Sequence, residues 1–342
     1  MSETRPRFLL ERGVQAELGA YVVGCAAAGE VAAWALGDGT VRRRAAGGGE
    51  WESVAVHDGA VLAFAADRAG GFVSGGDDGR FCRVGATGEA EEIAAFGRRW
   101  VEQVAAFSDG KTRLLACASG RTAHLFDGAG QKLKALEHPS TVTGLAFDGR
   151  GKRIGASHYN GASLWFVGAK EDKARVFEWK GSHIGITIHP AGDAVVTAMQ
   201  ENALHGWRLS DSQHMRMSGY PAKTESLSFS RTGKWLASSG AESVVLWPFF
   251  GGGPMGKAPA ELAGGDRMLC TRVAFHPAQD MVAAGFADGL VVLADVASER
   301  VLPVAPPGRG AVSALSWSAD GAQLAFGTEE GFAALVDLRA KQ

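Results

Sequence analysis

One short unit recurs along the whole 342-residue chain, and its period limits the possible folds more than any other feature. Each copy holds an alternating apolar strand, a second strand of small and apolar residues, a tight turn, and a third strand. Repeats of about 40 residues made of short strands are typical of β-propeller blades. The eight turns lie at positions 38, 78, 119, 160, 201, 241, 288 and 330.

The turns and strands carry suitable residues for this fold. Asp38-Gly39, Asp78-Gly79 and Asn160-Gly161 pair an acidic or amide residue with glycine. Such dipeptides readily adopt the positive φ that two-residue hairpin turns require. No helical period of 3.6 residues appears at comparable strength, so the chain is predicted to be all-β.

A blade cannot bury both of its faces alone, so the units are expected to close into a ring. The sequence predicts one domain over residues 1–342, a closed propeller of four-stranded blades with eight repeat units in residues 21–338. The last unit ends after its third strand, and residues 7–14 are predicted to supply the missing fourth strand. Eight blades are therefore predicted. Seven blades, with one decayed unit outside the ring, is the alternative.

These repeats resemble the WD-repeat β-propeller family in a degenerate form, most closely at Lys234–Trp247 and Asp320–Asp337. The family's stabilising tetrad joins a loop histidine, a strand serine or threonine, a turn aspartate and a third-strand tryptophan. No unit obviously keeps all four residues. The resemblance assigns tetrad positions to His57 and His138, to Asp38, Asp78 and Asp288, and to Trp207 and Trp247.

Composition argues against several classes of ligand and location. The net charge is −2 and no polybasic tail exists, so nucleic acid is not the expected partner. No run of 18 apolar residues occurs, so no membrane span is expected. The cysteines never form a C-x-x-C pair, and we expect reduced thiols in a cytoplasmic protein. The four cysteines are Cys25, Cys82, Cys117 and Cys270.

No catalytic motif, cofactor fingerprint or phosphate-binding glycine loop is present, so neither a cofactor nor a catalytic residue is predicted. No metal site is predicted either, because the histidines that fall in neighbouring units lack ligand spacing. The sequence thus favours a non-catalytic interaction scaffold or regulatory adaptor. The alternatives are a propeller hydrolase or isomerase acting on a small molecule at the channel mouth, and an accessory subunit of a metal-handling enzyme. The histidines considered are His183, His189, His205 and His214.

The family resemblance implies that one ring face binds a protein or peptide through the loops before the first strands and the turns between second and third strands. Tryptophan and arginine often dominate interfaces, so Arg98-Arg99-Trp100 is the strongest candidate. Packing between blades is the alternative for Trp100, and ion pairs with Asp77 and Asp78 are the alternative for the arginines. The candidate residues are Arg98, Arg99, Trp100, Tyr159, Asn160, Glu201, Glu242, Glu329 and Glu330.

The long segment 248–257 is a second candidate, expected on the opposite face. It contributes Phe249, Phe250 and Met255, either as an exposed apolar patch or folded back onto the blade edge. The chain by itself is expected to be a monomer.

Overall fold

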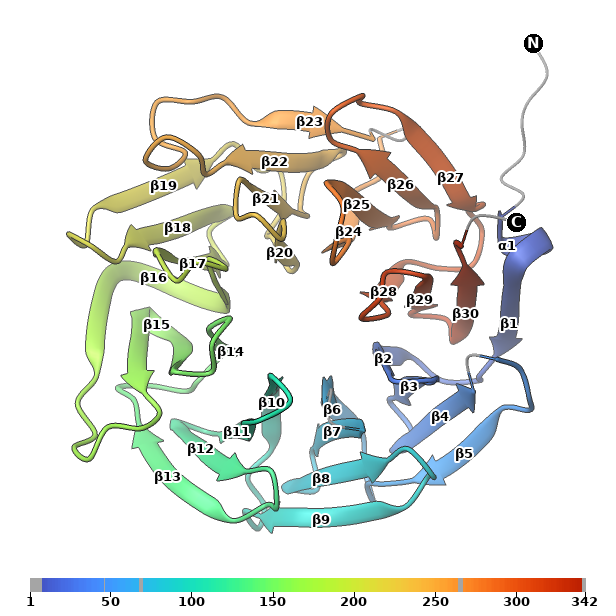
Figure 1. Ribbon diagram of the computed structural model, residues 1–342, viewed down its shortest axis with the longest axis horizontal. Coiled ribbons are helices and arrows are strands. Elements are labelled where there is room, and N and C mark those ends of the chain that lie inside the picture. Colours follow the sequence, from blue (N-terminus) through green and yellow to red (C-terminus); the bar gives the residue numbers. More distant parts are fainter. Residues whose placement is uncertain (1–7, 46, 68–69, 264–266, 340–342) are drawn as a thin grey trace.

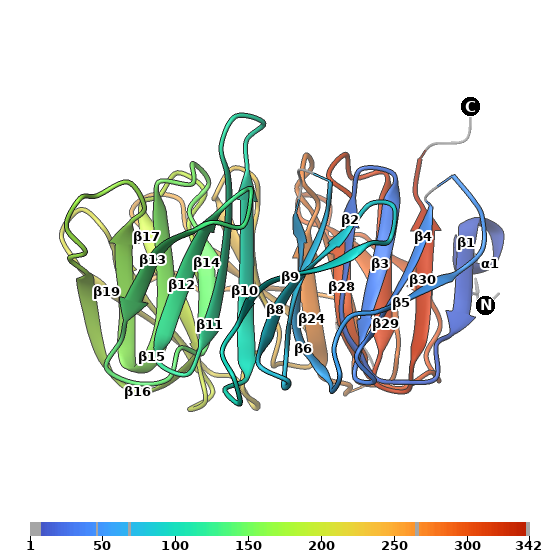
Figure 2. The same ribbon diagram turned by 90° about the horizontal axis from the view of Figure 1, so that it is seen from below.

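The computed structural model describes residues 8–339 except 46, 68–69 and 264–266. Its strands form antiparallel sheets that radiate around a central channel and close into a ring (Figure 1). In the side view the strands run across the thickness of this ring (Figure 2). The alternating apolar residues of each unit lie between neighbouring sheets, as a propeller requires.

Six sheets contain four strands each, and the seventh contains six. In chain order the first three sheets are β2 (Val22–Ala28), β3 (Val31–Leu36), β4 (Thr40–Ala45) and β5 (Glu52–Ala55); β6 (Val61–Asp67), β7 (Gly71–Gly76), β8 (Arg80–Gly85) and β9 (Ala90–Ala95); β10 (Val101–Ser108), β11 (Arg113–Ser119), β12 (Thr122–Asp127) and β13 (Lys132–Glu137). The six-stranded sheet is β14 (Gly144–Phe147), β15 (Arg153–Phe166), β16 (Arg175–Ile188), β17 (Ala194–Met199), β18 (Ala203–Arg208) and β19 (His214–Ser218). The remaining sheets are β20 (Leu227–Phe229), β21 (Trp235–Ser238), β22 (Val244–Pro248) and β23 (Ala260–Leu262); β24 (Cys270–Phe275), β25 (Met281–Phe286), β26 (Val291–Asp295) and β27 (Val301–Ala305); β28 (Val312–Trp317), β29 (Gln323–Thr328), β30 (Phe332–Asp337) and β1 (Gly13–Glu17).

The number of blades differs from the prediction. Counted as separate hydrogen-bonded sheets, the described strands form seven blades and not eight. The reason is β16, which pairs with β15 through residues 175–178 and continues without a loop into its pairing with β17 through residues 185–188. It joins the units around turns 160 and 201 into one sheet (Figure 1). The alternative count of seven is therefore correct, although both joined units lie within the ring rather than one outside it.

The N-terminal strand β1 completes the sheet that contains the C-terminal strand. It pairs antiparallel with β30, from Gly13 opposite Val336 to Glu17 opposite Phe332. The predicted bounds 7–14 are wrong, because Phe8–Arg12 forms the short helix α1 and the strand begins only at Gly13. Residue 7 lies outside the described residues.

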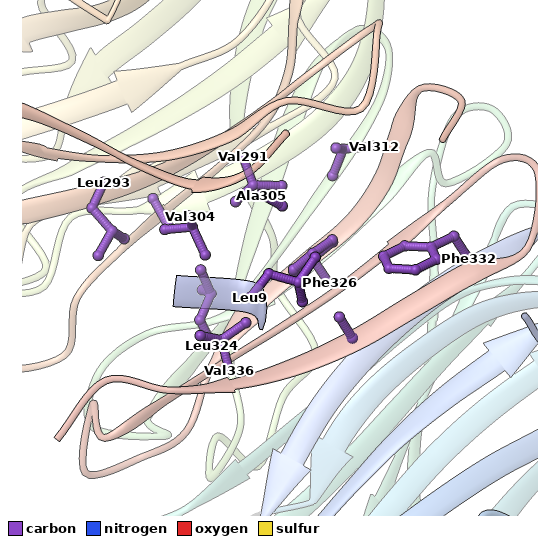
Figure 3. Packing of buried hydrophobic residues seen from close by; sticks show 12 residues of the cluster. Leu9, Val291, Leu293, Val304, Ala305, Val312, Leu324, Phe326, Phe332 and Val336 are labelled. Atoms are coloured by element: carbon purple, nitrogen blue, oxygen red, sulfur yellow. The ribbon is translucent and has the colours of Figure 1, made fainter. Parts of the chain in front are cut away.

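Helix α1 directs one leucine into the molecule and leaves the next one outside. Leu9 is 1% exposed and packs among the side chains of Val304 and Val336 from two neighbouring sheets (Figure 3), whereas Leu10 is 73% exposed. The N-terminal segment therefore contributes both a strand and an apolar anchor.

The sheet of β2–β5 packs against the sheet that β1 completes, and this contact joins the two ends of the chain. Trp34 is fully buried, and its Nε1 donates a hydrogen bond of 2.9 Å to the carbonyl of Phe326. Nearby, the hydroxyl of Ser313 donates to the carbonyl of Val22 at 2.6 Å. Residues about 290 positions apart are thus held by both apolar burial and hydrogen bonds.

Candidate partner-binding surface

The loops between successive sheets and the turns between second and third strands lie on one side of the ring, which we call the turn face. Two hydrogen bonds show the arrangement. The amide of Phe96 donates to the carbonyl of Gly79 at 2.9 Å, and the amide of His138 donates to the carbonyl of Arg121 at 2.9 Å. In each pair a loop residue contacts a turn residue. The candidate loop 98–100 is therefore placed on the face that the sequence analysis expected.

Arg98, Arg99 and Trp100 are all exposed on the turn face. The side chain of Trp100 is 55% exposed and belongs to none of the apolar clusters formed by the described residues. Within the described part of the chain, neither arginine forms an ion pair with Asp77 or Asp78. The two alternatives, blade packing and internal ion pairs, therefore receive no support from the contacts of these residues.

Tyr159 and Asn160 lie on the same face at a turn within β15. The backbone reverses at Asn160, whose φ is 64°, and this leaves Tyr159 55% exposed. Asn160 Oδ1 accepts a hydrogen bond from the amide of Gly181 at 3.2 Å, which fixes the turn against β16. Tyr159 borders a cavity of about 800 Å³ that is also lined by Pro139 and Val176.

The candidate glutamates are exposed but dispersed. They occupy turns of three different sheets around the ring, so they do not form one patch with the loop 98–100 (Figure 1). Glu201 is partly engaged, because its carboxylate accepts a hydrogen bond from the amide of Ser182 at 2.9 Å. These residues are Glu201, Glu242, Glu329 and Glu330.

The segment 248–257 only partly folds back onto its blade. Phe249 packs edge-to-face on Phe229, with ring centroids 4.9 Å apart. Phe250 stays 47% exposed, although it contacts Trp235, and Met255 is 50% exposed. Both predicted outcomes therefore occur in one segment, because the first phenylalanine is packed while the next apolar residues face outward.

One sheet keeps three members of the family tetrad. His57 Nε2 lies 2.9 Å from Ser74 Oγ, and His57 Nδ1 lies 3.0 Å from a carboxylate oxygen of Asp78. Burial alone would raise the pKa of Asp78, but hydrogen bonds from the amide of Arg80 and from His57 outweigh it and lower that pKa. By contrast, the carboxylate of Asp38 caps only its own turn through Thr40.

We expect Asp78→Asn to lower the free energy of unfolding at neutral pH by about 1–3 kcal/mol, because it weakens a largely buried hydrogen-bond network. The folded pKa of Asp78 is lowered, so its contribution is complete above the unfolded value of 3.8 and is lost as the pH falls through the folded value. Urea denaturation from neutral to acidic pH should show that the difference in free energy of unfolding between wild type and Asp78→Asn shrinks below about pH 4. Asp38→Asn is the matched control. An equal deficit in both variants would contradict the role of the network.

A second sheet forms three members of the tetrad, one of them a residue that the sequence pattern did not indicate. Trp247 Nε1 donates to the hydroxyl of Tyr220 at 2.6 Å, and that hydroxyl lies 2.6 Å from Ser238 Oγ. Tyr220 thus takes the place of the loop histidine, and burial raises its pKa to about 12. Its spacing of 18 residues before Ser238, against 17 between His57 and Ser74, is the signal that could have revealed it.

The candidate metal-ligating residues do not converge as a set. His205 Nε2 lies 2.9 Å from His214 Nδ1, but His183 contacts Thr197 and His189 contacts the carbonyl of Gly233. Among the described residues, no group of three or more histidine, cysteine, aspartate or glutamate residues could hold a metal ion. The four cysteines are free, and burial raises the pKa of the Cys82 thiol to about 11.

Comparisons with known proteins agree with the geometry of the ring. A family model described as the WD40 domain of anaphase-promoting complex subunit 4 matches residues 273–342. Among solved structures, the chain is similar to the computationally designed Ika8 protein, with 19% identity and a TM-score of 0.76 over 94% of this chain and 97% of that one. That likeness concerns the fold alone. No curated protein matches the sequence. In the part of the chain that the structure describes, no helix is long and apolar enough to span a membrane.

Proposed function

The chain is a WD-repeat β-propeller, and from this premise we propose that it is a non-catalytic scaffold or regulatory adaptor that presents its turn face to a protein or peptide partner. Members of this family commonly serve as protein-interaction scaffolds. The observation that carries the proposal is the exposure of Trp100, which is 55% accessible beside two arginines.

The chemistry of this loop suits a protein interface. Tryptophan offers a large contact area with few rotatable bonds, and arginine pairs with carboxylates through two parallel hydrogen bonds. Arg98 and Arg99 form no ion pair with any described residue, so their charges are available to a partner. The amide of Arg99 donates to the carbonyl of Phe96 at 3.4 Å, which supports the loop from within. A partner with an acidic rim around an apolar pocket would fit this loop.

The test is to capture partners from the native cells with three versions of the full chain: wild type, Arg98→Glu/Arg99→Glu, and a control with Arg121→Glu. Arg121 is also exposed on the turn face, but it already pairs with Glu137 at 3.1 Å. We expect the same partner with wild type and control, and loss of that partner with the double variant. A partner retained by the double variant, or none retained by wild type, would overturn the proposal.

A further inference from the structure

Two cavities lie side by side on the face opposite the turn face, near the contact between the β16–β19 and β20–β23 strands. The outer cavity has a volume of about 440 Å³, and Leu209, Met215 and Phe249 form its apolar wall. The inner cavity, of about 590 Å³, lies at the mouth of the central channel and includes Phe229 and Arg231. Both volumes fall in the range of pockets that bind side chains or small ligands.

Three aromatic rings from the walls of the two cavities contact one another. His189 lines the outer cavity and the next residue, Pro190, lines the inner one. The His189 ring lies 5.2 Å from the Phe229 ring and 6.2 Å from the Phe249 ring, while the two phenylalanines are 4.9 Å apart. One extended segment crossing these rings could therefore reach both cavities. At about 3.3 Å per residue, roughly two to four extended residues span about 7–13 Å, which exceeds the 4.9–6.2 Å between these ring centroids.

We call the route from the inner to the outer cavity across these three rings the aromatic path. The charges differ at its two ends. Arg231 is exposed at the inner cavity and forms no hydrogen bond or ion pair with any described residue, and it is the one charged side chain among the described residues that line this cavity. At the outer cavity the charge of Arg208 is offset by Asp211, to which its guanidinium donates three hydrogen bonds. The carboxylate of Asp193 is also there, and its side chain is 74% exposed.

We infer that the aromatic path is a second docking site, which takes an extended peptide segment of a partner protein. An acidic side chain of the segment pairs with Arg231 at the channel mouth, and an aromatic or branched aliphatic side chain two to four residues away fills the outer cavity. Asp193 sets the direction, because its exposed carboxylate, which lies 3.9 Å from His189 Nδ1, repels an acidic group at the outer cavity. The site does not depend on the loop 98–100, which lies on the other face.

The experiment is selection from a random heptapeptide library on the immobilised full chain, followed by fluorescence-anisotropy titration of the most enriched peptide. We expect enrichment of an acidic residue two to four positions from a large apolar residue. Arg231→Glu should weaken binding of that peptide at least about tenfold, since it reverses the central charge pair. Ser210→Trp should weaken it similarly, because the exposed Ser210 lines the outer cavity and the indole would fill it.

Arg98→Glu is the matched control, since it makes the same charge change on the turn face. It should leave the peptide affinity unchanged while weakening capture of the turn-face partner, so the two proposals fail separately. Both Arg231 and Ser210 are exposed, and melting temperatures check that the variants fold; if Ser210→Trp unfolds, Arg231→Glu decides alone. Selection of no peptide, selection without an acidic residue, or equal affinity for Arg231→Glu would overturn the inference.

Discussion

Deleting residues 1–17 should destabilise the whole ring by more than the roughly 2–5 kcal/mol expected for Leu9→Ala alone. The deletion removes β1 and leaves β30 as an unpaired edge, and an exposed strand edge invites association with other chains. It also removes Leu9 from the cluster formed with Val304 and Val336. Urea denaturation should show the largest loss for the deletion, and light scattering should show aggregation.

Leu10→Ala is the matched control for Leu9→Ala, because both leucines lie in α1 but Leu10 is 73% exposed. We expect the control to change the free energy of unfolding by less than about 0.5 kcal/mol. A deletion variant that melts at the temperature of the full chain would show that β1 does not close the ring. Equal losses for the two leucine variants would show that Leu9 is not an anchor.

Replacement of Trp34 by alanine should cost about 3–5 kcal/mol of folding stability. Its indole is fully buried between the first and last sheets of the ring, beside Trp51 at 4.7 Å between ring centroids. Trp34→Phe should cost less, because it keeps an aromatic ring while it leaves the carbonyl of Phe326 without this donor. Thermal and urea denaturation of both variants measure the difference. A loss for Trp34→Phe as large as that for alanine would assign the effect to the hydrogen bond rather than to burial.

The fold could be predicted from the sequence because its units repeat a local signal. Turn residues such as Asp78-Gly79 and Asn160-Gly161 act over a few positions, and the strands between them need only neighbouring units to bury their apolar residues. The number of separate sheets could not be predicted in the same way. It depends on the hydrogen bonding of β16, which continues from one repeat unit into the next.

The N-terminal closure shows a second limit. The residues that follow Arg7 look like an apolar strand, yet Phe8–Arg12 is helical. Leucine, glutamate and arginine are good helix formers, and the helix buries Leu9 against distant sheets. Tyr220 shows a third limit: a tyrosine replaces the loop histidine, so a search for the family residue passes over it. The turn-face position of Arg98-Arg99-Trp100 followed from the repeat, but its lack of ion pairs depends on side-chain geometry that sequence does not specify.

The affinity of the turn-face partner for the Trp100→Ala variant tests the central proposal most directly. Titration calorimetry with wild type, Trp100→Ala and Phe166→Ala compares two exposed aromatic side chains, since Phe166 is 59% exposed outside the loop. We predict that Trp100→Ala weakens binding by about 2 kcal/mol and leaves the melting temperature unchanged. Phe166→Ala should change neither the affinity nor the melting temperature. A severe loss of stability in Trp100→Ala, with affinity intact in the folded fraction, would contradict the proposal that this loop binds the partner.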